Sequence, residues 1–247
     1  MTAPRGAPSV LLITDPRWPL ARIEEVIEVA GAALAPGAFA VQLRDKAASR
    51  ADLARSARAL RAVTARVGAR LLVNAPTLEA LDVSADAGAD GAHVPCLADR
   101  IAGARERLGA AAWISTPAHT DDGVRVARSA GATMVLVSPI FASPGKGAPR
   151  GVDALTRARA CASAGVTVAF AGALTASPAG AATAAPAGAL VVLALGGVDA
   201  SRAAACADAG AHGVAVIRAL LDAEDAGSTA RALDAPFQRR ASPASRG

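Results

Sequence analysis

The chain has 247 residues, of which 53% are hydrophobic and 19% charged, enough for one large domain around a sizeable core. Only 2% are aromatic, and the arginines behind the net charge of +5 are scattered among acids. This composition argues against a nucleic-acid partner, which needs stacking faces or a clustered basic patch, but it suits an anionic small molecule.

Short apolar runs recur along the chain, and longer amphipathic segments lie between them. Runs such as Val10–Ile13 and Val191–Leu195 are wholly apolar, as is typical of parallel strands buried on both faces. Strands that alternate with helical segments predict βαβ units. The predicted strands are Val10–Thr14, Ala40–Leu43, Arg70–Asn74, Gly91–Val94, Ala112–Ser115, Met134–Ser138, Val191–Leu195 and Gly213–Ile217. The predicted helices include Arg22–Ala33, Arg50–Val67, Leu78–Ala87, Ala98–Leu108, Asp122–Ala130 and Ser201–Ala209.

These eight strands predict an α/β fold of one domain, a closed (β/α)₈ TIM barrel. The alternative is an open doubly wound sheet, which usually has a glycine-rich turn after its first strand. The first predicted strand ends in Thr14-Asp15-Pro16 without a GxGxxG motif, so the barrel is favoured.

The barrel is expected to span residues 9–225, between two disordered ends at 1–8 and 226–247. An Ala/Gly/Pro-rich insert interrupts it at about 166–190, and Val166–Ala171 is a candidate extra strand within that insert. The insert is longer than a simple barrel connection needs.

The cysteines and the apolar runs indicate the cellular compartment in which the protein is expected to act. Cys96, Cys161 and Cys206 are odd in number and lack metal-ligand spacing, so reduced thiols in a cytoplasmic protein are expected. The first residues lack the apolar core of a signal peptide. Pro and Gly interrupt the apolar run Ala182–Val198, so neither a transmembrane helix nor a membrane partner is predicted.

Three rare residues stand just past the ends of predicted strands. The chain has two lysines among its 26 cationic side chains, Lys46 and Lys146, and one asparagine, Asn74. Almost every other cationic side chain of the chain is an arginine, which indicates that arginine could not fill these positions. Active sites of barrels lie at this carboxyl-terminal rim. The alternative is that the three are incidental surface residues.

Two groups of rim residues are candidate anion-binding sites. Alternation along the second strand places Gln42, Arg44 and Lys46 on one side; the alternative is a ladder of solvated charges. Glycines and a helix start after the last two strands can direct backbone N–H groups at a phosphate, although a glycine pair can also be a mere tight turn. The predicted phosphate-binding residues are Gly196, Gly197, Ile217 and Arg218, and Ser143 and Lys146 of the strand-six loop add a hydroxyl and a charge.

Three histidines complete the candidates. His119 follows the fifth strand and reaches the rim, where it can act as a general acid/base. His93 lies inside the fourth strand and is expected to be a core histidine or a support for a site residue. His212 precedes the eighth strand, at the opposite end of the barrel, and is expected to be structural.

Taken together, these motifs resemble the thiamine phosphate synthase/TenI family over about Leu11–Leu221, apart from the insert. Each motif alone is weak, but their number and order make the resemblance strong. It implies a barrel enzyme of thiamine biosynthesis. The motifs are Ile13-Thr14-Asp15, Val41–Lys46, Leu71–Asn74, Gly88–His93, Val137–Lys146, Leu195-Gly196-Gly197 and Gly213–Ile217.

The resemblance also implies two ligand sites. Synthases of this family hold the pyrophosphate of a hydroxymethylpyrimidine with strand-two side chains, and a thiazole phosphate with backbone after strands seven and eight. The matching positions in this chain are Gln42, Arg44, Lys46, Asn74, Lys146, Gly197, Ile217 and Arg218.

Departures from the synthase pattern fall on its metal ligands. The family pattern places Mg²⁺-binding aspartates at two positions where this chain has Ala75 and Ala98, and Asp99 is displaced by one residue. Mg²⁺ requires oxygen ligands at short, near-octahedral distances, so no metal site is predicted. The strand-six loop also lacks one expected hydroxyl, at Gly145.

TenI, the thiazole tautomerase branch, needs no metal and isomerises a thiazole phosphate carboxylate by proton transfer with a histidine after strand five. His119 falls in that register when counted back from Gly131, although Pro117-Ala118 resembles an insertion. The string His93-Val94-Pro95 is also more similar to TenI than to the synthases.

The sequence therefore favours a TenI-like thiazole tautomerase with His119 as acid/base, no cofactor, and Arg44 or Lys46 meeting the substrate carboxylate. Its partner is a small phosphorylated thiazole. One alternative is a Mg²⁺-dependent thiamine phosphate synthase, and another is a non-catalytic phosphothiazole-binding barrel. The oligomeric state stays open.

Overall fold

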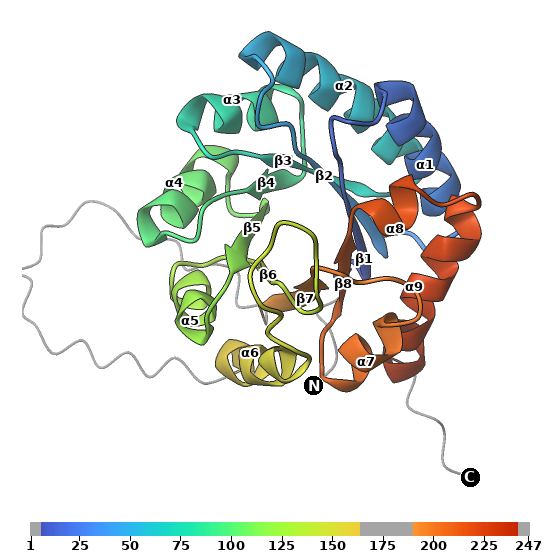
Figure 1. Ribbon diagram of the computed structural model, residues 1–247. Helices are drawn as coiled ribbons and strands as arrows, with labels where there is room; N and C mark the ends of the chain where they lie inside the picture. Colours follow the sequence, from blue (N-terminus) through green and yellow to red (C-terminus); the bar gives the residue numbers. More distant parts are fainter. Residues whose placement is uncertain (1–5, 164–189, 242–247) are drawn as a thin grey trace, which may run out of the picture.

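The computed structural model describes residues 6–163 and 190–241. Eight parallel strands close into a barrel in chain order, with β1 pairing both β2 and β8 (Figure 1). This confirms the predicted TIM barrel over the open sheet. The insert, with its candidate extra strand, lies outside the described residues except at Leu190. The strands are β1 Val10–Ile13, β2 Phe39–Leu43, β3 Arg70–Asn74, β4 Gly91–His93, β5 Trp113–Ala118, β6 Met134–Val137, β7 Val191–Leu195 and β8 Gly213–Val216.

Helices surround the strands in an outer ring, and hydroxyl side chains begin several of them. Ser49, Thr77 and Thr120 each accept a backbone N–H from the first turn that follows, which stabilises the helix start. None of the described helices is long and apolar enough to cross a membrane. The helices are α1 Leu20–Ala32, α2 Arg50–Arg66, α3 Leu78–Asp86, α4 Ala98–Leu108, α5 Asp121–Ser129, α6 Asp153–Ser163, α7 Ala203–Asp208, α8 Arg218–Leu221 and α9 Ala226–Ala241.

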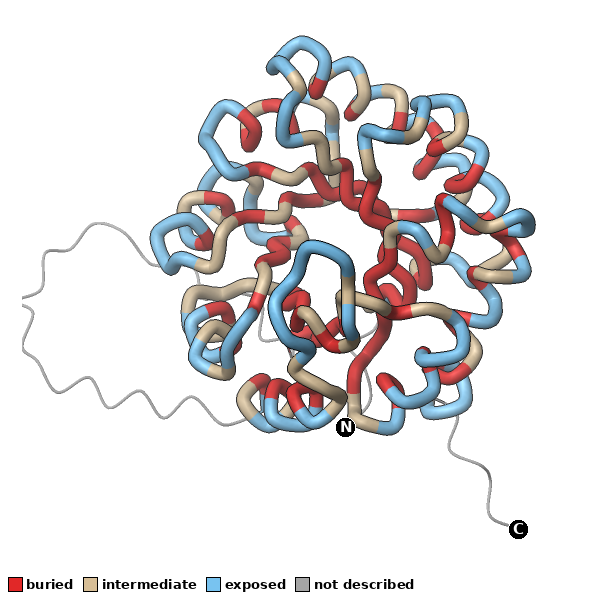
Figure 2. The backbone as a smooth tube through the Cα atoms, viewed as in Figure 1, coloured by how far each residue is buried: buried red, intermediate tan, exposed pale blue. Residues whose placement is uncertain are grey.

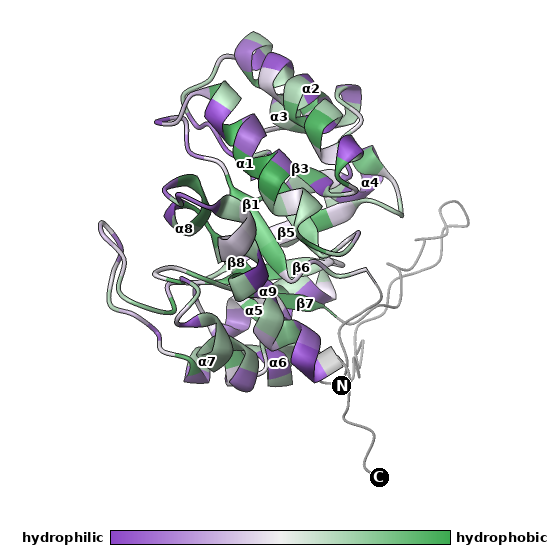
Figure 3. Cartoon of the chain, turned by 90° about the vertical axis from the view of Figure 1, so that its right-hand side faces the viewer, coloured by the Kyte–Doolittle hydropathy of each residue, from purple (hydrophilic) through white to green (hydrophobic). Residues whose placement is uncertain are grey.

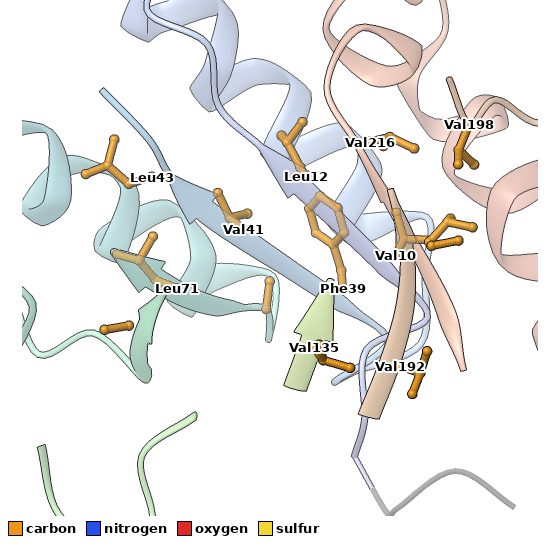
Figure 4. Packing of buried hydrophobic residues seen from close by; sticks show 14 of the residues in the cluster. Val10, Leu12, Phe39, Val41, Leu43, Leu71, Val135, Val192, Val198 and Val216 are labelled. Atoms are coloured by element: carbon orange, nitrogen blue, oxygen red, sulfur yellow. The ribbon is translucent and has the colours of Figure 1, made fainter. Parts of the chain in front are cut away.

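The core has two layers, which the alternation along each strand separates. Side chains such as Val10, Phe39 and Val41 face the helices (Figure 4), whereas Ala40 and Leu72 belong to a smaller cluster inside the barrel. Burial is concentrated on the strands (Figure 2), and hydrophilic residues lie on the outer faces of the helices (Figure 3). The predicted alternation therefore holds within β2 itself, which ends at Leu43; beyond it, Asp45 lines the same cavity as Arg44 and Lys46, although it was predicted to point away from them.

Strand β5 is longer than predicted, since it continues through Pro117 to Ala118. Pro117 pairs in register with Leu136 of β6, so Pro117-Ala118 is a regular part of the strand. The position tolerates proline because its nitrogen faces β4, and β4 has already ended at His93.

The expectation of a disordered tail after residue 225 is wrong for most of its length, because Ala226–Ala241 form helix α9. Ala226, Ala230, Leu233 and Phe237 are buried at helical spacing, and the helix packs on α1 and α7. At the other end of the chain, residues 1–5 lie outside the description, while Ala7 packs against the inner cluster.

His212 lies at the amino-terminal end of the barrel, as predicted, and it joins two strands. It is 8% exposed, and its Nδ1 accepts the backbone N–H of Val192 at 2.8 Å. Burial and the nearby Arg159 guanidinium lower the pKa of His212 to about 3. The folded protein therefore holds His212 in its neutral form.

Helix α9 is expected to be part of the stable barrel. The substitution Leu233→Ala should lower the free energy of unfolding by about 2–5 kcal/mol, the usual cost of truncating a fully buried leucine. Arg239→Ala, on the exposed side of the same helix, should change it little. Urea denaturation of both variants measures this, and equal stabilities would mean that α9 contributes nothing to the fold.

The depressed pKa of His212 predicts a loss of stability in acid. Unfolded histidine titrates at about 6.5, so between about pH 3 and 6.5 the unfolded chain binds more protons than the folded one. The unfolding free energy should rise with pH across this window. His212→Asn keeps an acceptor for Val192 but does not titrate, so its denaturation midpoints should depend less on pH than those of a His119→Asn control. Parallel pH profiles for the two variants would contradict the assignment.

Candidate active site

Two cavities open among the loops at the carboxyl ends of the strands. The β2–β5 cavity has a volume of about 650 Å³, and the β7–β8 cavity, which loops after β1 and β6 also line, about 570 Å³. The β2–β5 cavity is lined by residues that include Arg44, Asp45, Lys46, Arg50, Asn74, Glu79, His93, Val94, Pro95 and Pro117. The β7–β8 cavity is lined by residues that include Asp15, Arg17, Ser143, Gly196, Gly197, Asp199, Arg202, Ile217, Arg218 and Asp222.

A row of four inward-facing polar residues runs along the wall of the β2–β5 cavity; three of them line the cavity, and the fourth, Ser115, is buried next to it. Asn74 pairs in register with His93, and His93 with Ser115. Arg44 continues the row, because Leu43 pairs with Val73 and the next residues are therefore neighbours. We call Arg44, Asn74, His93 and Ser115 the polar row. It presents a cation, an amide, an imidazole and a hydroxyl at one level of the barrel.

The structure brings together most, but not all, of the predicted anion ligands of strand two. Arg44 is partly buried, and its backbone N–H donates to Thr14 Oγ1 at 2.9 Å. Lys46 is exposed at the cavity edge, and Asn74 lies in the wall. Gln42 is separate: it lies deeper in the barrel, is 2% exposed and lines neither cavity. Among the described residues, its Oε1 has no hydrogen-bond partner.

His93 belongs to the cavity wall, a more exposed setting than a core histidine has. Its Nδ1 lies 3.0 Å from Ser115 Oγ. Burial, together with the charge of Arg44, lowers the pKa of His93 to about 4, so the ring is neutral near pH 7. The sequence predicted a core histidine or a support for a site residue; the structure places His93 in the cavity wall, and its role stays a prediction.

The two glycines after β7 hold the loop after β6 at very close range. Gly196 and Gly197 have φ values of 99° and 63°, and a Cβ on Gly197 would lie 2.5 Å from the carbonyl oxygen of Ala142. Phe141 donates its backbone N–H to the carbonyl of Gly196 at 2.9 Å. The glycine pair is therefore a packing requirement between two rim loops as well as a wall of the cavity.

Charges around the β7–β8 cavity are balanced, since three arginines and three aspartates line it. Arg17 donates to Asp15 and holds the pKa of that carboxyl below its usual value. The Ser201 hydroxyl, followed by Arg202, does the same for the pKa of Asp199. An anion in this cavity therefore depends on directed donors more than on net charge. Sequence reasoning missed Arg17 and Arg202, which are indistinguishable in sequence from the many surface arginines.

Backbone donors are present in the β7–β8 cavity. Ile217 and Arg218 open the short helix α8. Within the described part of the chain, the amide N–H groups of Gly197 and Arg218 make no backbone hydrogen bond. Ser143 lines the same cavity, as predicted for a phosphate ligand.

His119 and Lys146 line neither cavity. His119 is exposed directly after β5, and its Nδ1 lies 3.1 Å from the carbonyl oxygen of Ser138. An Nδ1–H that donates to this carbonyl leaves Nε2 free as a base. Lys146 is exposed on the loop between β6 and α6, which arches over the barrel mouth (Figures 1 and 2).

A magnesium ion held by protein carboxylates does not fit these residues. Ala75 is 2% exposed and carries no oxygen ligand, and Ala98 is the first residue of α4. The described ranges contain no group of three His, Cys, Asp or Glu side chains that could hold a metal ion.

Known proteins share this barrel and much of this sequence. A family model described as thiamine monophosphate synthase matches residues 10–220. A putative thiamine-phosphate synthase from Geobacter sulfurreducens is 34% identical over 228 residues, or 91% of this chain and 92% of that protein. The thiamine-phosphate synthase of Moorella thermoacetica is 31% identical over 84% of this chain and 86% of its own. A thiamine phosphate pyrophosphorylase from Pyrococcus furiosus has the same fold, with a TM-score of 0.69 at 21% identity over 94% of this chain and 96% of that one. The chain therefore belongs to the thiamine monophosphate synthase family.

Proposed function

We propose that the protein is a metal-independent thiazole phosphate tautomerase of the TenI type within this family. The observation that carries the proposal is the pair Ala75 and Ala98, which stand where synthases are expected to have Mg²⁺-binding aspartates. Departure of pyrophosphate needs its charge neutralised, whereas an isomerisation by proton transfer does not.

His119 would be the acid/base of this isomerisation. Its Nδ1–H donates to Ser138 O, which orients the ring and leaves Nε2 to take a proton from one position of the substrate and return a proton to another. No atom is gained or lost overall. Neighbours of His119 reach both cavities: Pro117, two residues before it, lines the first, and Pro139, next to Ser138, lies close to Gly196 of the second.

The two cavities would divide one substrate between them. Gly196, Gly197, Ile217, Arg218 and Ser143 would hold the phosphate, and Arg44 or Lys46, assisted by Asn74, would meet the carboxylate. Lys146 and Gln42 would take part only if the rim loop moved or the substrate reached deeper.

A second candidate is a thiamine phosphate synthase. The names of the similar proteins support it, and so do two separate cavities, which suit two anionic substrates. Mg²⁺ would then have to come bound to the diphosphate substrate, since the chain offers no carboxylates at positions 75 and 98.

Phosphate binding should depend on Gly197. In Gly197→Ala the new Cβ would lie 2.5 Å from Ala142 O, so both rim loops must shift and inorganic phosphate should bind about tenfold more weakly or worse. Gly88→Ala is the matched control: this glycine has the same φ of 63°, and a Cβ there meets nothing within 4 Å. Calorimetry measures the phosphate affinity of both variants, and equal affinities would contradict the assignment of the phosphate site to the β7–β8 cavity.

The two candidate reactions differ in their need for metal. Isomerisation of the thiazole phosphate carboxylate should persist in EDTA, and His119→Ala should slow it by about 10²-fold or more, the usual contribution of a positioned acid/base. Coupling of hydroxymethylpyrimidine pyrophosphate to thiazole phosphate should be very slow. Purified protein is assayed for both reactions with and without Mg²⁺.

Each outcome of these assays selects one function. Mg²⁺-dependent coupling that survives His119→Ala would establish the synthase instead. Tight phosphate binding without either reaction would identify a non-catalytic binding barrel. Ser129→Ala, at the exposed end of α5 and outside both cavities, is the control for unspecific losses.

A further inference from the structure

The polar row contains a histidine that the proposed tautomerisation does not use. His93 lies between Asn74 and Ser115 in register and lines the β2–β5 cavity together with Arg44. His119, by contrast, is exposed beyond both cavities, and His212 lies at the other end of the barrel. Of the three histidines in the chain, His93 is therefore the one in a cavity wall.

The contact between His93 and Ser115 selects one form of the imidazole. Ser115 is 1% exposed, and its hydroxyl has no hydrogen-bond partner in the described ranges other than His93 Nδ1, at 3.0 Å. A buried hydroxyl that only accepted would leave its own proton unpaired, which is costly. Ser115 therefore donates to Nδ1, and the ring proton of His93 sits on Nε2.

Charge around His93 favours a neutral ring. The charged groups that line the cavity with it are Arg44, Asp45, Lys46, Arg50 and Glu79. Burial and the charge of Arg44 lower the pKa of His93 to about 4, so the ring adds no further positive charge near pH 7. What remains is an Nε2–H donor on a ring whose other nitrogen is fixed.

We propose that His93 is a neutral hydrogen-bond donor to the anionic oxygens that Arg44 and Lys46 attract into the β2–β5 cavity, with Ser115 as the residue that fixes its tautomer. The inference rests on the proposed function only in treating this cavity as an anion site. The oxygens belong either to a carboxylate or to a diphosphate. Such a donor fixes the direction of one contact to the anion, which the charges of Arg44 and Lys46 alone would not do.

Binding measurements with two probes test the donor. The protein is titrated in EDTA with inorganic pyrophosphate and, separately, with thiazole-2-carboxylate, and the probe that binds identifies the source of the oxygens. His93→Leu should weaken that binding about tenfold or more, as expected for a lost hydrogen bond to a charged group. His93→Gln, whose amide nitrogen can replace Nε2–H, should stay within about threefold of the native protein.

Two further variants separate the donor from general damage. Ser115→Ala leaves His93 in place but frees its tautomer, so binding should weaken less than in His93→Leu. Ser129→Ala, at the exposed end of α5 and outside both cavities, should bind the probe as the native protein does. Native-like affinity of His93→Leu, or binding of neither probe by the native protein, would overturn the proposal.

Nitrogen NMR measures the tautomer of His93 in the native protein itself, and variants serve only to assign the signals. The chain has three histidines, so ¹⁵N-histidine labelling yields a spectrum that single His→Gln variants assign. His93 should stay neutral from about pH 8 to about pH 5 with its proton on Nε2, and its Nε2 signal should shift when the probe binds. A proton on Nδ1, or an unmoved signal with the probe bound, would refute the proposal. Failure of the tautomerase assay would not affect either measurement, so the two proposals stand or fall separately.

Discussion

Closing eight strands into one barrel brings neighbouring backbones so near that side chains have no room at certain points. A Cβ on Gly91 would lie 1.9 Å from the carbonyl oxygen of Trp113, and one on Gly213 would lie 2.4 Å from that of Ser9. Both glycines begin their strands, at the closely packed amino-terminal end. The opposite end is left open, and every strand delivers its last residues there. All the candidate chemistry depends on this closure.

As the proposed anion sites, the two rim cavities would attract anions by different physics. In the β2–β5 cavity, Arg44 and Lys46 stand at the end of one strand, and attraction comes from charge close to a wall of low polarity formed by Val94 and Pro95. In the β7–β8 cavity the charges are balanced, and recognition would depend on backbone donors around Gly197. Salt should therefore weaken binding to the first cavity more than to the second.

The sequence predicted the barrel, the strand order and the inward alternation of β2, because these follow from local periodicity. It could not predict which inward residues share a cavity, since that depends on register between strands: Gln42 and Arg44 are two residues apart, yet one is sealed in the core and the other lines a cavity. Helix α9 was missed because it contains Pro236, its apolar stripe has only two large side chains, and a polar, Arg-rich end follows. The extension of β5 through Pro117 was missed because the early end of β4 is visible only in three dimensions.

The scarcity of lysine gives the molecule an unusual surface chemistry. Both lysine side chains, Lys46 after β2 and Lys146 on the loop after β6, are exposed at the same rim, while the remaining cations of the chain are arginines. Reagents that modify primary amines should thus attach, apart from the chain's first residue, only beside the two cavities. A fluorophore or surface linker introduced in this way would sit at the mouth of the barrel without any engineered cysteine.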